Sequence, residues 1–177
     1  MGIRSFAALA GACCALGAQA QGTHPSEEIT RRIAAAVDHY ATSIGCQHAD
    51  VTANDMSAPA PRAANASADY VVIWDGDIGC QGHAGNVSSN IAIVSPAADG
   101  TLAVVAARSS PHVAFPLPLA YEHRIIGRTA DTLTLEGTFL GDGDALCCPS
   151  DRRRYTLRRD ERGGWTIVDQ RELDPKK

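Results

Sequence analysis

The first regular pattern in the chain is an apolar stripe with helical spacing. It begins after Ser26, and its members recur every three or four residues, as on one face of an α-helix. Glu27 and Glu28 stand in the first turn, where the helix dipole favours negative charge, and Gly45 stands where a left-handed C-terminal cap belongs. The stripe consists of Ile29, Ile33, Ala36, Val37, Tyr40 and Ile44. The pattern predicts one N-terminal amphipathic helix, with His39 on its solvated side.

Short apolar runs separated by turns follow a Pro-, Ala- and Ser-rich loop over 49–68. In Thr132–Leu140 apolar and polar residues alternate, which is the period of a half-buried strand. Asp99-Gly100 is typical of a hairpin turn, and prolines mark 109–119 as a crossing loop. The predicted strands are Tyr70–Trp74, Asn90–Val94, Thr101–Ala107, Tyr121–Gly127, Thr132–Leu140, Arg153–Arg159 and Trp165–Arg171. One helix before about seven antiparallel strands predicts an α+β fold in which the helix packs on the sheet.

The composition is that of one globular domain with a core. The chain has 177 residues, of which 45% are hydrophobic and 20% charged, with a net charge of −4. Such a balance gives no general attraction to nucleic acid or anionic lipid. Since only 5% of the residues are aromatic, we expect no stacking platform for bases.

The first twenty residues have the three parts of a secretory signal. A positively charged start is followed by an apolar stretch over 6–16 and an Ala-Gln-Ala cleavage site at 18–20. The apolar stretch is too short to cross a bilayer as a helix. We therefore expect a signal peptide at 1–20 and a single exported domain at 21–177, in the periplasm or secreted. An alternative is lipidation at Cys13.

Export changes the interpretation of the cysteines, because disulfides persist in oxidising compartments. Cys46, Cys80, Cys147 and Cys148 remain after cleavage. A bond between the adjacent pair would close a strained ring. The favoured prediction therefore joins Cys46 and Cys80 each to one member of the pair, and the alternative joins Cys46 to Cys80. Each long-range bridge would contribute about 3–4 kcal/mol in the chain-entropy model.

A metal site is not predicted. Asp75, Asp77 and Gly79 have the D-x-D-x-G spacing that begins many calcium loops, but the next acidic ligand is missing. Asp142 and Asp144 would contribute only if the fold brought them close. No paired C-x-x-C motif points to zinc, and we expect no cofactor.

A catalytic alternative centres on His83. It lies in a glycine-rich loop near Asp75 and Asp77, where a general base would be placed. The sequence supplies no matched nucleophile and no G-x-S-x-G motif. His112 and His123 stand isolated. A small periplasmic hydrolase using His83 with Asp75 or Asp77 is therefore the second hypothesis.

Arginines crowd the last predicted hairpin. Arg154 and Arg158 share one strand face with Thr156, and arginine forks suit carboxylates and phosphates. They are candidate binding residues together with Asp77 and His83. The alternative is a charged edge that prevents strand-to-strand aggregation.

The segment Gly143–Ser150 reads Gly-Asp-Ala-Leu-Cys-Cys-Pro-Ser and precedes a basic strand and a Gly-Gly-Trp hairpin. This last third of the chain resembles the C-terminal signature of small secreted bacterial proteins of the LppP/LprE lipoprotein kind. The resemblance implies an exported, disulfide-bearing domain and carries over no catalytic residue. The leading prediction is a non-enzymatic domain that binds a protein or an envelope component. Inhibitor- or immunity-type roles fit its size and its expected export.

Overall fold

The computed structural model describes residues 25–45, 48–58, 69–80, 87–118, 120–145 and 147–174. The expected signal peptide, Cys46 and His83 lie outside these residues. Within the described part of the chain, no helix has the length and hydropathy to cross a bilayer.

The predicted α+β class is confirmed, with one α-helix and eight strands in the described residues. The helix is α1 (Glu27–Ile44), and the 3-10 turns are η1 (Ala53–Asp55) and η3 (Ala106–Arg108). The N-terminal sheet contains, side by side, β1 (Met56–Ser57), β2 (Tyr70–Gly76), β3 (Ser88–Pro96) and β4 (Leu102–Val104). The C-terminal sheet contains β5 (Glu122–Arg128), β6 (Thr132–Phe139), β7 (Asp151–Arg159) and β8 (Trp165–Glu172). All paired strands are antiparallel.

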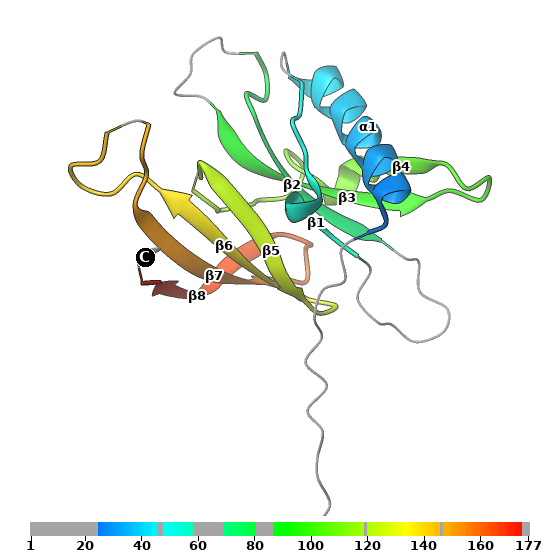
Figure 1. Cartoon of the computed structure of the whole chain (residues 1–177). Coiled ribbons are helices and arrows are strands. Elements are labelled where there is room, and N and C mark those ends of the chain that lie inside the picture. The colour runs from blue at the N-terminus through cyan, green and yellow to red at the C-terminus, as the bar shows by residue number, and fades with distance from the viewer. Residues whose placement is uncertain are drawn as a thin grey trace, which may run out of the picture.

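Two four-stranded sheets therefore replace the single sheet of about seven strands that the sequence predicted. The reason lies in β2, which is apolar on both faces. Val71 and Ile73 join the core between the two sheets, whereas Val72 and Trp74 join the core under α1. Because both faces of this sheet must be covered, the helix takes one face and the C-terminal sheet takes the other. Figure 1 shows α1 and the C-terminal sheet on opposite sides of β2 and β3.

The start of α1 follows its sequence pattern, but its end does not. Ser26 accepts a hydrogen bond from the Ile29 N–H at 3.5 Å, and Ile33 and Val37 are fully buried. Gly45 has a φ of −137°, so the expected left-handed cap is wrong. A Cβ at Gly45 would lie 2.7 Å from the Asp77 carbonyl oxygen. Glycine is needed there because the chain after β2 passes close by.

The C-terminal sheet buries only its inner face. On β6 the buried residues Leu133, Leu135 and Phe139 alternate with half-buried polar residues, as the period of two predicted. In the last hairpin Leu157 lies opposite Ile167, and a bulge between Thr156 and Leu157 shifts the pairing of the residues before it. No described helix or strand covers the outer face.

The crossing loop over 109–118 connects the sheets and closes the edge of β3 beyond the short β4. The Ser109 and Ser110 side chains accept hydrogen bonds from the backbone N–H groups of Ile93 and Ile91, at 2.9 and 3.2 Å. Both serines are buried, so these bonds satisfy donors that would otherwise have no partner. The predicted strand Thr101–Ala107 is accordingly shorter, ending at Val104 before η3.

Candidate functional site

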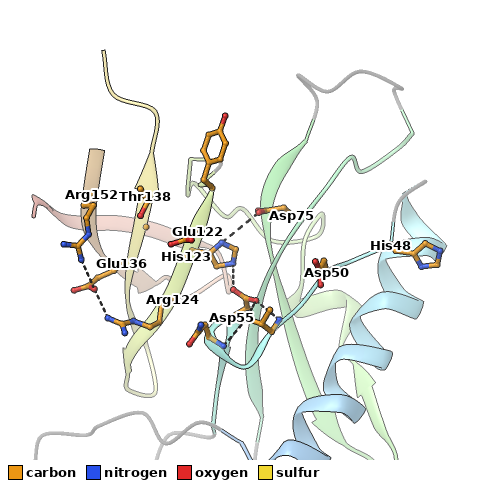
Figure 2. A pocket seen from close by; sticks show the side chains of 14 residues that line it. His48, Asp50, Asp55, Asp75, Glu122, His123, Arg124, Glu136, Thr138 and Arg152 are labelled. Carbon is orange, nitrogen blue, oxygen red and sulfur yellow. Dashed lines mark hydrogen bonds and ion pairs between the residues drawn. The ribbon is translucent and has the colours of Figure 1, made fainter. Parts of the chain in front are cut away.

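A cleft of about 620 Å³ lies where the edge of the C-terminal sheet faces η1 and the end of β2. Figure 2 shows His123 between Asp55 and Asp75, and Arg124, Glu136 and Arg152 in a separate group beside them. The lining holds two guanidinium groups, Arg124 and Arg152, and a larger number of carboxylates. These carboxylates are Asp50, Asp55, Asp75, Glu122 and Glu136. The cleft is therefore acidic when its histidines are neutral.

His123 lies at the inner end of this cleft, between two carboxylates. Its Nε2 is 3.1 Å from Asp55 Oδ1, and its Nδ1 is 4.0 Å from Asp75 Oδ2. The side chain is only 8% exposed. Its position follows from the strand period, because His123 and the buried Ile125 lie on the same face of β5.

The contact between His123 and Asp55 is close but poorly aligned. Nε2 and Oδ1 are within ion-pair distance, yet Nε2 makes no hydrogen bond within the described residues. A buried polar atom without a hydrogen bond is costly, and buried polar groups are normally satisfied by protein, water or ligand. A bound molecule that forms a hydrogen bond with this nitrogen would therefore gain binding free energy.

Asp55 is fixed by the turn that precedes β1. Its Oδ2 accepts hydrogen bonds from the Thr52 backbone N–H at 2.6 Å and from Thr52 Oγ1 at 2.8 Å. The Thr52 hydroxyl in turn accepts from the N–H of Asn54, which completes a capping box. One carboxylate oxygen of Asp55 thus holds the turn, and the other faces His123.

Asp75 approaches the same histidine from β2. Ser89, its cross-strand neighbour on β3, donates a hydrogen bond to Asp75 Oδ1 at 2.7 Å. Burial raises the pKa of Asp75 above its ordinary value, and the negative charge of Asp55 adds to the rise. The Ser89 hydrogen bond and the charge of His123 act in the opposite direction without cancelling it.

The mouth of the cleft carries acidic and aromatic groups. Asp50 and Glu122 are exposed, and neither forms an ion pair with another described residue. Tyr121, beside them in the lining, is 51% exposed. An exposed tyrosine ring next to uncompensated carboxylates is a favourable surface for a cation.

Glu136 neutralises the arginines on the other wall. It receives a hydrogen bond from Arg124 at 3.0 Å and one from the Nε of Arg154 at 3.2 Å, and Arg152 lies 4.0 Å away. Burial acts to raise the pKa of Glu136, but the hydrogen bonds from Arg154 and Arg124 outweigh it and lower the pKa. The arginines therefore do not offset the acidity of the inner cleft.

The structure separates the residues that the sequence grouped. Asp75 lines the cleft, whereas Asp77 is buried beyond the end of β2 and is not among the lining residues. Arg154 is engaged by Glu136, and Arg158 is exposed on the outer face of β7. Whether His83 approaches Asp75 stays a prediction, because it lies outside the described residues.

Asp55 was not among the predicted site residues, and His123, which was expected to stand isolated, faces two carboxylates. Thr52-Ala-Asn-Asp55 is a capping-box pattern that marks a fixed turn. In β5, His123 stands two residues before the buried Ile125 and so has the register of an inward-facing residue. The capping-box pattern and the strand register could both be found in the sequence, but neither indicates that Asp55 and His123 approach each other.

Within the described residues, no group of three or more His, Cys, Asp or Glu side chains is placed to hold a metal ion. Asp144, one of the two further acidic candidates, uses its carboxylate to bind Gly141 and Ser150 in its own loop. These hydrogen bonds lower the pKa of Asp144, and the one from the Gly141 backbone has the largest effect.

The cysteines also depart from the favoured pairing. Cys147 and Cys148 are exposed free thiols, so bridges from this pair to Cys46 and Cys80 are not formed. Cys80 is disulfide-bonded. The pair lies in the loop between β6 and β7, on the rim of the C-terminal sheet.

No protein-family model, curated protein or solved structure matches the chain. The functional argument therefore depends on the geometry of the cleft. That geometry combines a buried imidazole, two carboxylates facing it and an acidic mouth.

Proposed function

We propose that the protein is an exported binding domain whose cleft receives a cationic group, a guanidinium or an ammonium, from a protein or envelope partner. The observation that carries this proposal is the excess of carboxylates around the buried His123 nitrogen that lacks a hydrogen bond. The signal-like segment at 1–20 supports the exported part of the proposal.

The charges divide the cleft into two parts. Glu136 occupies the arginines of one wall, which leaves Asp50, Asp75 and Glu122 to set the potential of the other. A partly enclosed acidic cleft concentrates field lines and steers cations toward it. Tyr121 at the mouth adds an aromatic face that a guanidinium group can cover.

A titration monitored by NMR tests the proposal. Arginine amide should shift the backbone signals of 50–55 and 121–124 in a saturable way, whereas N-acetylaspartate, an anionic probe, should not. Asp75→Asn removes one inner charge and should weaken binding by about tenfold, which corresponds to 1.4 kcal/mol. Arg158→Gln, remote from the cleft, is the matched control. Equal shifts with the anionic probe would contradict the proposal.

General acid–base catalysis is the second candidate, favoured by the raised pKa of Asp75 beside His123. In this alternative His123 takes the role that the sequence assigned to His83. A panel of ester and amide substrates distinguishes the two. If the protein turns a substrate over, His123→Gln should lower the rate by about a hundredfold or more. If only cation binding is seen and no substrate reacts, the binding function stands.

A further inference from the structure

A second cleft of about 520 Å³ adjoins the first, and both cysteines of the adjacent pair line it. Tyr121, Glu122 and Arg152 line both clefts, so the two share a wall. The thiols of Cys147 and Cys148 are exposed and free. Neither the binding function nor the disulfide framework uses them.

The loop that carries the thiols is held in shape. Asp144 Oδ2 accepts hydrogen bonds from the N–H groups of Gly141 and Ser150, both at 2.7 Å, and its Oδ1 accepts from Ser150 Oγ at 2.8 Å. The Cys148 N–H donates to the Ala145 carbonyl at 2.9 Å. One carboxylate thus ties both ends of the loop together and presents the cysteines at the cleft.

We propose that Cys147 and Cys148 form a thiol–disulfide exchange site for a polar organic disulfide that enters this cleft. The Cys147 thiolate attacks one sulfur of that disulfide, forming a mixed disulfide and releasing the other half as a thiolate. Cys148 then loses its proton to the released thiolate and attacks the Cys147 sulfur, which expels the second half. The two protein thiols are oxidised to a disulfide, and the organic disulfide is reduced to two thiols.

The order of attack follows from the contact between the two cysteines. A side-chain hydrogen bond to Cys147 is the largest of the causes that raise the pKa of Cys148, with burial and the charge of Asp144 adding to it. Cys148 therefore keeps its proton and donates it to the Cys147 sulfur. Since the thiolate is the nucleophile, Cys147 reacts first and Cys148 resolves the intermediate.

Adjacency makes the oxidised form reversible. Consecutive Cα atoms lie about 3.8 Å apart, closer than the usual 4.4–6.8 Å of disulfide-bonded cysteines. A disulfide in so small a ring is strained, and strained, exposed disulfides are easily reduced. The pair is thus suited to exchange rather than to permanent cross-linking.

Reaction of the full mature protein with glutathione disulfide, followed by intact mass and peptide mapping, tests the proposal. The wild type should lose two hydrogens at the Cys147–Cys148 peptide and release two glutathione molecules. Cys148→Ser should stop with one glutathione attached to Cys147. Cys147→Ser should react more slowly, because burial and the charge of Asp144 still raise the pKa of the remaining Cys148 thiol. Circular dichroism of each variant checks folding.

Three results would overturn the proposal. The first is native protein in which Cys147 or Cys148 is bonded to Cys46 or Cys80. The second is wild-type protein that gains no glutathione and loses no hydrogens while a maleimide still labels both thiols. The third, equal rates for the two single variants, would overturn the assignment of Cys147 as nucleophile. The binding experiment with arginine amide is independent of all three.

Discussion

The two sheets have the same number of strands but opposite surroundings. The N-terminal sheet is covered on both faces, so β2 and β3 are apolar at nearly every position from Val71 to Trp74 and from Ile91 to Val94. The C-terminal sheet is covered on one face, so β6 alternates strictly. The difference shows that a continuous apolar run marks a central layer, and an alternating run marks an outer one.

The same difference determines which sheet contributes polar side chains to the two clefts. The central strands β2 and β3 are buried on both faces over most of their length, and they contribute to the cleft only through Asp75 at the end of β2. The outer layer contributes β5, β6 and the loop with Cys147 and Cys148. Polar groups accumulate where one sheet ends and the other begins, because water still reaches that boundary.

A charge placed in each sheet should give the largest difference in stability between the two layers. Val72→Asp buries a carboxylate between α1 and the N-terminal sheet, where Val72 is fully buried. We expect it to lower the free energy of unfolding by about 4 kcal/mol or more. Thr134→Asp, on the half-buried outer face of β6, should cost less than about 1 kcal/mol. Urea denaturation of both variants measures the difference, and equal losses would refute the layer assignment.

A cavity under the helix is expected to have the next largest effect. Ile33 is fully buried against the N-terminal sheet, so Ile33→Ala should cost about 2–4 kcal/mol. His39 is exposed on the same helix, and His39→Ala serves as the matched control with almost no effect. A loss below about 0.5 kcal/mol for Ile33→Ala would mean that the helix does not pack there.

The ion network of the outer layer should contribute less. Glu136→Gln removes the acceptor of Arg124 and Arg154 and should cost about 1 kcal/mol at neutral pH. Because the folded pKa of Glu136 is lowered, its contribution is complete above the ordinary value of 4.5 and is lost as the pH falls through the folded pKa. Denaturation of variant and wild type from pH 7 to pH 3 should show the two curves converging. A difference that is constant with pH would argue against the network.

The smallest expected effect is a gain in stability, whereas the other substitutions lower the free energy of unfolding. Burial holds the pKa of Asp75 above its ordinary value, so the charged carboxylate weakens the folded state at neutral pH. Asp75→Asn keeps an acceptor for Ser89 and should raise the free energy of unfolding by up to about 1 kcal/mol at pH 7. The gain should shrink as the pH falls through the folded pKa, where wild-type Asp75 becomes protonated. Asp50→Asn, exposed at the mouth, should change nothing.

A residue that lines a cleft and destabilises the fold is a candidate for a role in binding rather than in stability. If Asp75→Asn stabilises the protein and also weakens arginine amide binding, the carboxylate has a functional role. If Asp75→Asn destabilises the protein, Asp75 is a structural member of the boundary between the sheets. Thermal denaturation and the NMR titration on one preparation decide between the two.

The local structure could be predicted from the spacing of residues along the chain. The helical stripe gave α1 from Glu27, the apolar runs gave β2 and β3, and alternation gave β6. These patterns depend on contacts between near neighbours and on which face of an element is buried, and residue spacing records both. The α+β class followed from their order.

Only the tertiary structure decided how many sheets form and which side chains meet. Asp55, Asp75 and His123 belong to η1, β2 and β5, and they approach one another because the two sheets stack in one orientation. That stacking depends on the buried areas of whole faces and on the path of the crossing loop, which no local spacing encodes. The free Cys147–Cys148 pair has the same cause, because the loop that carries it is fixed by Asp144 within its own hairpin.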